Sequence, residues 1–584
     1  MMRSGIVIGL LATVCAAAPA LGEDVRVEAP DGFVVEQVAS EPAIRFPMFA
    51  CFDDAGRLFV AESSGLDLYD GLQKQTRKCR VTMLEDKDGD GRFETSKIFA
   101  DKLVFPMGLA WRDGALYVAD PPDLITLIDT DNDGRADQRK VILSGFGHLD
   151  NGSLHGLTFG PDGLLYMTMG SPDGYKLKAA DGSVLAGTSG ALLRCRPDGT
   201  YAEALCRGFE NLVEIAFLPS GEIIGTDNWY QKPLGGVRDA LVHLVEGGLY
   251  PMHLSDLGTT HVITGDPLPP LATFPAVAVS GLMRYEGFSL PAAMRGNLFA
   301  AQHNTRKVTR HRLERVGATF KSVDTDFVTS AHPDFHPSDV LEDADGSVLV
   351  VDTGGWYVQH CPTGKIRDSR APGGIYRVRF RTTEKVPDPW GLAFAWETLE
   401  PAALANSLRD TRPVVRRKAE RALVLRGDAA VEHLHPLLSD QNEITQSHAA
   451  WGLAAIGSEA ALKPMRDLIV DEPNHPVVLR SLAHRADKQA SPSLAQWVSR
   501  CDDAAVRLAL AEALIRCGTA TSVPSIIAAL AGEKERFIEH ALIVALHRLG
   551  DQEQLAAALS ETRLQVLTAA QWPQRDLGGR RITP

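Results

Sequence analysis

One pattern of apolar and polar positions recurs along the first two thirds of the chain. Each copy has a short apolar stretch, a turn built on Asp-Gly or a related pair, and a second apolar stretch that often ends in an acid. The six copies lie at Phe49–Glu62, Gly108–Asp120, Gly156–Thr168, Glu214–Asp227, Leu290–His303 and Asp339–Asp352. Alternating stretches around an Asp-Gly turn are typical of β-hairpins, so the pattern predicts six of them.

The spacing of these hairpins predicts a propeller. Their second strands begin near Leu58, Leu116, Leu165, Ile223, Leu298 and Val348, about 50 to 75 residues apart. A hairpin repeated in this way needs neighbours to bury its faces, and closure into a ring leaves few exposed edges. We therefore expect an all-β six-bladed propeller over residues 23–380, in which the strand Gly373–Phe380 closes the ring.

The pattern becomes helical after a Pro-containing linker at residues 381–398. Apolar residues then recur at i, i+3, i+4 and i+7. Five such segments follow at intervals of 28 to 33 residues, at Val414–Leu423, Ile444–Leu453, Val477–Ala486, Ala505–Leu514 and Phe537–Leu546. Paired helices at this interval predict an all-α HEAT-like solenoid over residues 399–570, with a loose tail at 571–584.

The N-terminus predicts export. Arg3 precedes the apolar stretch Gly5–Ala18 and a small-residue cleavage site at Ala20–Gly22, which is the pattern of a signal peptide over residues 1–22. No later apolar run is long enough to span a bilayer, so we expect a soluble periplasmic or extracellular protein. The formal net charge of −14 argues against nucleic acid as a partner.

The cysteines leave two interpretations open. Cys195 and Cys206 flank a Pro-Asp-Gly turn, so they could form a disulfide or remain buried thiols. The chain has no Cys-x-x-Cys-His segment, so we expect no covalently bound haem.

Two acidic loops are candidate metal sites. Both read D-x-D-x-D-G-x-x-[DE], with candidate ligands Asp86, Asp88, Asp90 and Glu94 in one loop and Asp129, Asp131, Asp133 and Asp137 in the other. Alternate acids in a tight loop direct hard oxygen ligands at one centre, which suits Ca²⁺. We expect structural calcium; the alternative is a pair of solvated acidic turns.

Polar residues also enter the first strand of several hairpins, where a propeller chain passes close to the central channel. When the repeats are superposed on their turns, His155, Asn211 and Asp339 fall at similar places. His155 and Asp339 are therefore candidate general bases, and Asn211 is a candidate ligand-binding residue. Alternatively, His155 is hydrogen-bonded to a neighbouring blade.

A further set of candidate ligand-binding residues follows the second strands. It comprises Asp227, Asn228, Trp229, His303, Asp352 and Trp356. Polar groups beside Trp suit a sugar, whose ring stacks on the indole while its hydroxyls bond to Asp and Asn. The alternative is that the acids cap turns and the Trp residues pack between blades.

Four sequence segments resemble those of exported propellers called PVC-type haem-binding or membrane-bound-dehydrogenase-like proteins. They lie at residues 155–168, 207–229, 352–362 and 373–378. These are distant relatives of soluble glucose and sorbosone dehydrogenases that depend on pyrroloquinoline quinone (PQQ). The resemblance implies PQQ-type oxidation of a sugar or alcohol at the channel. In those enzymes an Arg contacts the anionic cofactor where this chain has Glu210.

Two functions follow as hypotheses. The first is a dehydrogenase-like protein that oxidises or binds a sugar or polyol and passes electrons to a separate carrier. The second is a non-catalytic scaffold that binds a glycan or a protein. In either case the helical repeats offer a surface for a protein partner.

Overall fold

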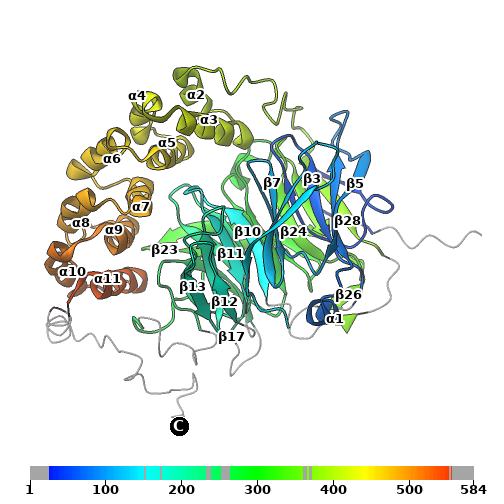
Figure 1. Cartoon of the computed structure of the whole chain (residues 1–584), viewed down its shortest axis with the longest axis horizontal. Coiled ribbons are helices and arrows are strands. Elements are labelled where there is room, and N and C mark those ends of the chain that lie inside the picture. Colours follow the sequence, from blue (N-terminus) through cyan, green and yellow to red (C-terminus); the bar gives the residue numbers. More distant parts are fainter. Residues whose placement is uncertain are drawn as a thin grey trace, which may run out of the picture.

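A computed structural model of the chain describes residues 25–66, 68–149, 153–170, 174–231, 238–251, 263–359, 365–366, 371–551 and 554. Six four-stranded antiparallel sheets stand in a ring, and an arc of helices lies along one side of it (Figure 1). The predicted six-bladed propeller followed by a helical solenoid is confirmed. The predicted signal peptide and tail lie outside the described residues.

The blades follow one another along the chain. From the channel outward, the first five are β2 (Pro47–Phe52), β3 (Leu58–Glu62), β4 (Cys79–Glu85), β5 (Thr95–Leu103); β6 (Leu109–Arg112), β7 (Ala115–Asp120), β8 (Asp123–Ile128), β9 (Gln138–Ser144); β10 (Leu154–Phe159), β11 (Leu165–Met169), β14 (Gly190–Cys195), β15 (Glu203–Phe209); β16 (Asn211–Phe217), β17 (Ile223–Gln231), β18 (Arg238–Leu244), β19 (Ala272–Phe274); and β20 (Val279–Arg284), β21 (Leu298–Gln302), β22 (Lys307–Val316), β23 (Thr319–Thr329). The smaller elements are α1 (Leu68–Lys74), η2 (Ala292–Met294) and the two-stranded ribbons β12 (Tyr175–Lys178) with β13 (Val184–Gly187) and β26 (Tyr357–Gln359) with β27 (Lys365–Ile366).

The sixth blade closes the ring in a way the sequence did not predict. It consists of β24 (Pro337–Glu342), β25 (Val348–Asp352), β28 (Gly374–Phe380) and β1 (Phe33–Ala39). The strand expected to close the ring, β28, is only the third strand, and the N-terminal β1 pairs with it as the outer strand. The two ends of the propeller sequence are thereby held in one sheet.

One hairpin was placed wrongly. The fifth pattern, Leu290–His303, contains the second strand of its blade, β21, but the residues before its turn form the short helix η2. The true first strand is β20, which begins at Val279 and pairs with β21 across this insertion.

The innermost strands β2, β6, β10, β16, β20 and β24 contact one another in ring order. Their approach is close: a Cβ on Gly108 would lie 2.3 Å from the carbonyl oxygen of His155, and one on Gly281 would lie 2.6 Å from the Cα of Asp339. Side-chain hydroxyls also join blades, since Thr168 Oγ1 donates to the carbonyl of Val213 at 2.6 Å.

The helical region forms an arc of helix pairs. Its α-helices are α2 (Pro401–Ser407), α3 (Pro413–Arg426), α4 (Val431–Leu434), α5 (Glu443–Ile456), α6 (Glu459–Asp471), α7 (Pro476–Arg485), α8 (Ser491–Trp497), α9 (Ala504–Cys517), α10 (Val523–Leu530) and α11 (Arg536–Leu549). Short 3-10 turns join them: η3 (Gly427–Ala430), η4 (His435–Ser439), η5 (Lys488–Ala490) and η6 (Ala520–Ser522). All five predicted helical segments are confirmed as α3, α5, α7, α9 and α11, and these lie on the inner side of the arc (Figure 1).

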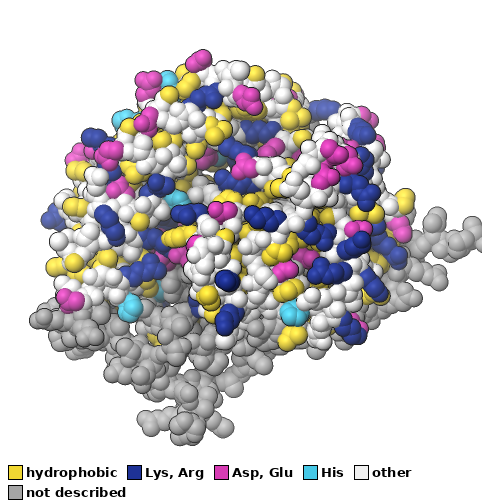
Figure 2. Space-filling view, viewed as in Figure 1, with side chains coloured by type: hydrophobic (Ala, Val, Ile, Leu, Met, Phe, Trp, Pro, Cys, Tyr) yellow, Lys and Arg dark blue, Asp and Glu magenta, His cyan; other side chains and the backbone are white. Residues whose placement is uncertain are grey.

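The inner helices contact the end of the propeller that carries the hairpin turns, which we call the turn face. Lys418 Nζ donates to the carbonyl of Asp54 at 2.7 Å, and Arg480 Nη1 donates to that of Ser220 at 3.0 Å. Basic and acidic side chains are interspersed where the arc meets the blades (Figure 2). One hydrophobic cluster includes both blade residues, such as Leu244, and helix residues, such as Val544. The solenoid is therefore packed onto the propeller.

Two sequence questions are answered by the described residues. Cys195 and Cys206 are buried free thiols, so the disulfide considered above is not formed. Among the described helices, none is long and apolar enough to cross a membrane.

Candidate functional site

A cavity of about 90 Å³ lies in the channel at the end opposite the turn face, which we call the cavity face. Residues that begin the innermost strands, and residues that follow the second strands, line it. They are Met48, Phe49, Phe105, Met107, His155, Asn211, Val213, Asn228, Ala278, Val279, Ser280, His303, Ser338, Thr353, Trp356 and Tyr357. None of the described lining residues is Lys, Arg, Asp or Glu.

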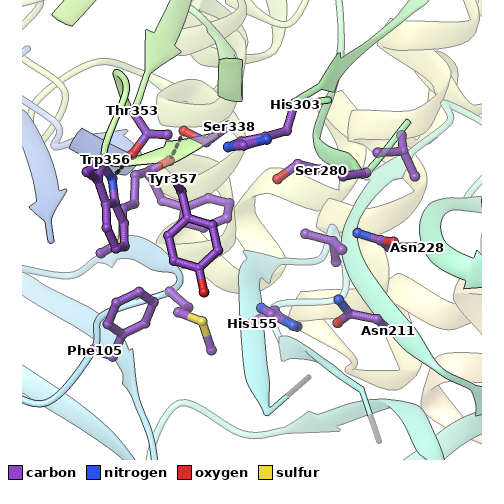
Figure 3. A pocket seen from close by; sticks show the side chains of 16 residues that line it. Phe105, His155, Asn211, Asn228, Ser280, His303, Ser338, Thr353, Trp356 and Tyr357 are labelled. Atoms are coloured by element: carbon purple, nitrogen blue, oxygen red, sulfur yellow. Dashed lines mark hydrogen bonds between the residues drawn. The ribbon is translucent and has the colours of Figure 1, made fainter. Parts of the chain in front are cut away.

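The cavity has an aromatic side and a polar side (Figure 3). Trp356, Tyr357 and Phe105 lie together on one side, whereas His155, Asn211 and Asn228 face them from the other. The indole of Trp356 is fixed because its Nε1 donates to Thr353 Oγ1 at 3.0 Å. The rings of Trp356 and Tyr357 stand at 75° to each other, so the arrangement offers an aromatic corner opposite hydrogen-bonding groups.

Five of the nine predicted catalytic or ligand-binding residues line this cavity: His155, Asn211, Asn228, His303 and Trp356. Asn211 and Asn228 are direct partners in the register of β16 and β17. The ring of His303 stacks on that of His336, with centroids 4.6 Å apart. The side chain of Trp229 lies outside what the structure describes.

The two asparagines have unfilled hydrogen-bonding capacity. Asn211 is 5% exposed and Asn228 is 4% exposed. Within the described part of the chain, the Oδ1 of each is buried without a hydrogen-bond partner. Since an unsatisfied buried amide costs free energy, the pair is suited to a polar ligand.

The three predicted aspartates lie behind the cavity wall instead of lining it. Asp227 Oδ1 accepts from the backbone N–H of Asn211 at 3.2 Å. Asp352 Oδ1 accepts from the N–H groups of His336 at 2.7 Å and Gly354 at 3.0 Å. These two acids hold the chain that enters and leaves the blade, which is the capping role considered above.

Asp339, a predicted general base, is also turned away from the cavity. Its Oδ2 accepts from the N–H of Ala50 in the next blade at 2.9 Å, and its Oδ1 accepts from the N–H of Val340 at 2.7 Å. Burial raises the pKa of Asp339 to about 6 and that of Asp352 to about 7. Burial also raises the pKa of Asp227 well above its usual range.

Several lining residues were absent from the predicted set, notably Ser280, Tyr357 and Phe105. A signal for Ser280 exists in the sequence. Met107, His155 and Ser280 each precede a glycine whose missing Cβ allows the next blade to approach. This residue-Gly pattern identifies the channel position even where the Asp-Gly turn is missing.

The two acidic loops join the outer strands of the first two blades. The first lies between β4 and β5, and one oxygen from each of Asp86, Asp88, Asp90 and Glu94 lies within 4.8 Å of the others. The second lies between β8 and β9 and gathers Asp129, Asp131 and Asp137 in the same way. Calcium at either loop stays a prediction.

Asp133 does not join the second cluster. Its carboxylate accepts from the N–H of Arg135 at 2.8 Å, and its carbonyl accepts from Lys97 Nζ at 2.6 Å. The second loop thus presents three acids where the sequence predicted four.

A comparison with protein families identifies the propeller part. Residues 24–382 match the model of a domain of unknown function, DUF7133, and residues 401–485 match HEAT repeats. The chain belongs to the DUF7133 family. The predicted resemblance to PVC-type haem-binding proteins is not confirmed for this DUF7133 protein, and a comparison with curated proteins gave no match.

Solved structures similar to this DUF7133 protein include sugar dehydrogenase propellers. An oxidoreductase (glucose dehydrogenase) from Thermus thermophilus has 19% identity and a TM-score of 0.40, over 59% of this chain and 99% of that one. The PQQ-bound aldose sugar dehydrogenase from Streptomyces coelicolor has 16% identity and a TM-score of 0.40, over 60% and 100%. The PQQ domain of pyranose dehydrogenase from Coprinopsis cinerea has 14% identity and a TM-score of 0.39, over 61% and 97%. Similarity at this level says nothing of activity.

The described cavity residues do not fit PQQ. PQQ is an anionic quinone, and the described lining offers no cation to neutralise it. Asp227, Asp339 and Asp352 stand behind the wall, where negative charge would oppose an anionic ligand.

Proposed function

We propose that this DUF7133 protein binds a small sugar or polyol in the channel cavity without turning it over. The observation that carries the proposal is the division of the cavity into an aromatic side and an amide-rich side (Figure 3). Sugar rings present C–H faces that pack on indole and phenol rings, while their hydroxyls both donate and accept hydrogen bonds.

The polar side supplies the matching groups. Asn211 and Asn228 can each accept from a ligand hydroxyl at Oδ1, where no described group donates. His155, Ser280 and Ser338 add further donors and acceptors at the same cavity. A ligand hydroxyl would satisfy amides that are costly to bury alone.

The test is calorimetric titration of the full chain with aldoses (glucose, galactose, xylose) and polyols (sorbitol, glycerol). We expect saturable binding of at least one of them. Asn211→Ala should weaken it about tenfold, because one hydrogen bond to a buried group is lost. Asn474→Ala, on the solenoid surface, serves as the matched control and should bind like the wild type. Absence of binding across the panel would reject the proposal.

Oxidation of the bound hydroxyl is the second candidate. It is favoured by the two imidazoles in the lining, His155 and His303, either of which could accept a hydroxyl proton. Oxidation also needs a hydride acceptor, and the described residues do not fit the anionic quinone. Dye reduction by the native protein, with PQQ and Ca²⁺ added and the same sugar panel, would support oxidation over binding alone.

We also propose that any protein partner of the helical repeats uses the outer side of the arc. The inner helices are occupied by the turn face, as the contacts of Lys418 and Arg480 illustrate. The outer helices α2, α4, α6, α8 and α10 leave a curved surface for a partner. Cross-linking in the native host would identify which helices a partner touches.

A further inference from the structure

Acids that have no counter-charge among the described residues lie behind the wall of the cavity. Asp227, Asp339 and Asp352 are each adjacent in sequence to a lining residue, namely Asn228, Ser338 and Thr353. Their exposed fractions are 0%, 3% and 0%. The half-buried Glu214, next to the lining residue Val213, adds a fourth acid, on the innermost strand of the fourth blade.

Only neutral groups stabilise these carboxylates. Backbone N–H groups are the hydrogen-bond donors to Asp227, Asp339 and Asp352 among the described residues. None of the three forms an ion pair within the described part of the chain. The Oδ2 atoms of Asp227 and Asp352 are buried there without any hydrogen-bond partner.

The equivalent acid of the first blade shows that the fold can neutralise this position. Glu62 also ends a second strand and also accepts from the entering chain, at the N–H of Arg45. However, Arg80 pairs with its carboxylate at 2.8 Å. The acids of the fourth and sixth blades lack such an arginine among the described residues, so no described cation balances their charge behind the cavity wall.

The aromatic side of the cavity also favours a positively charged ligand. Phe49, Phe105, Trp356 and Tyr357 all line this one cavity. The faces of aromatic rings attract cations, most strongly where water is excluded. An anion would meet both the ring quadrupoles and the acids unfavourably, whereas a cation would be favoured by both.

We propose that the ligand of the channel cavity carries a positive charge beside its hydroxyls, as an amino sugar or amino polyol does. This inference rests on the proposed function and names its ligand class. The hydroxyls bond to Asn211 and Asn228, and the ammonium group supplies the counter-charge that the described acids lack.

Two matched sets of probes test the charge preference at pH 8, by calorimetry on the full chain. One set is glucosamine, glucose and glucuronate; the other is 1-amino-1-deoxysorbitol, sorbitol and gluconate. In the set that binds, we expect the amine to bind about tenfold more tightly than its neutral parent, and the carboxylate to bind at least about tenfold more weakly.

Variants locate the effect. Asp352→Asn keeps the oxygen that accepts from His336 but removes the charge, so it should reduce the preference for the amine while leaving the neutral parent bound as before. Asp467→Asn, exposed on the solenoid, is the matched control. If circular dichroism shows that Asp352→Asn does not fold, Asp227→Asn and the wild-type probe sets still test whether the cavity prefers a positively charged ligand.

The outcomes separate the two proposals. If a neutral parent and its carboxylate bind as tightly as the amine, the charge preference is wrong and the proposed sugar or polyol binding stands. If no probe of either set binds, the proposed function is rejected and the charge preference with it.

Discussion

At the turn face of the propeller, buried acids meet arginines. Glu222 is held by Arg315 at 2.7 Å and approached by Arg480 at 3.8 Å, and although burial opposes ionisation, these guanidiniums lower the pKa of Glu222 to about 2. Glu246 is held in the same way by Arg516 at 2.8 Å and Arg548 at 2.6 Å. At the cavity face, burial acts on Asp339 and Asp352 without an arginine among the described residues, and their pKa values rise.

This contrast separates acids that hold the fold together from acids that are retained at a cost. Paired acids at the turn face fix the solenoid on the blades, because Arg480 and Arg516 belong to its inner helices. Buried carboxylates without a cationic partner destabilise a fold unless a bound ligand supplies the missing charge. Strongly perturbed carboxyls next to a cavity are a common feature of functional sites, which supports placing function at the cavity face.

The largest expected effect comes from breaking a pair at the turn face. Arg480→Met removes the guanidinium that lies 2.8 Å from Glu512 and 3.8 Å from Glu222, leaving two acids at the interface with less compensation. We expect a loss of about 3 kcal/mol in the free energy of unfolding, measured by urea titration. Lys463→Met, which removes an exposed pair with Asp467, should cost less than about 1 kcal/mol. Equal losses in the two variants would contradict the structural role of the interface.

Removing the charge of an acid at the cavity face should instead increase the free energy of unfolding. The pKa of Asp352 is about 7 in the folded protein and about 3.9 when unfolded. Because its pKa is raised by folding, protonated Asp352 stabilises the folded protein below about pH 4. This contribution is lost as the pH rises through about 7 and the buried carboxyl ionises. Asp352→Asn should therefore raise the free energy of unfolding at pH 8 by about 2 kcal/mol and change it little at pH 4.

Urea titrations of wild type and variant at both pH values give this difference, and Asp467→Asn controls for the general effect of removing a negative charge. A destabilised Asp352→Asn at pH 8 would mean that the charge is balanced in the fold and that the contrast between the two faces is wrong.

The sequence pattern predicted local structure, the hairpins and helices, better than long-range pairing. Period-two alternation around Asp-Gly turns predicted five hairpins correctly, and helical spacing predicted α3, α5, α7, α9 and α11. The fifth hairpin failed because its first strand, β20, is separated from β21 by an insertion that includes η2 and has no Asp-Gly turn of its own. The closing strand β1 pairs with β28 across almost the whole propeller sequence, and no local pattern specifies such a partner.

The site was predicted in position but not in orientation. His155, Asn211 and Asp339 enter equivalent strands, yet only the first two line the cavity. In the sixth blade Ser338 takes that place, and its neighbour Asp339 points to the other side of the strand. A shift of one residue reverses the face of a strand, and superposition on the turns could not resolve it. Helical periodicity likewise gave the helices but not which side contacts the blades.

The acidic loops of the first two blades provide a third kind of acid and the smallest expected effect. Asp86, Asp88 and Asp90 are half-buried or exposed and meet mainly backbone N–H groups, as in the bond from Gly89 to Asp86 Oδ1 at 2.8 Å. A Ca²⁺ ion would give them the counter-charge that arginine gives the turn face. At ten times its dissociation constant, Ca²⁺ should add about 1.4 kcal/mol to the free energy of unfolding.

The measurement is the melting temperature in excess EDTA and in excess Ca²⁺, with Mg²⁺ as the control for ionic strength. The first loop gathers four acids and the second three, so Asp88→Asn in the first should remove more of the Ca²⁺-dependent shift than Asp131→Asn in the second. An unchanged melting temperature in Ca²⁺ would mean that these acids lie in solvated turns that bind no calcium. The fold would then leave its exposed acids to water, neutralise those at the turn face, and keep unpaired buried acids at the cavity face.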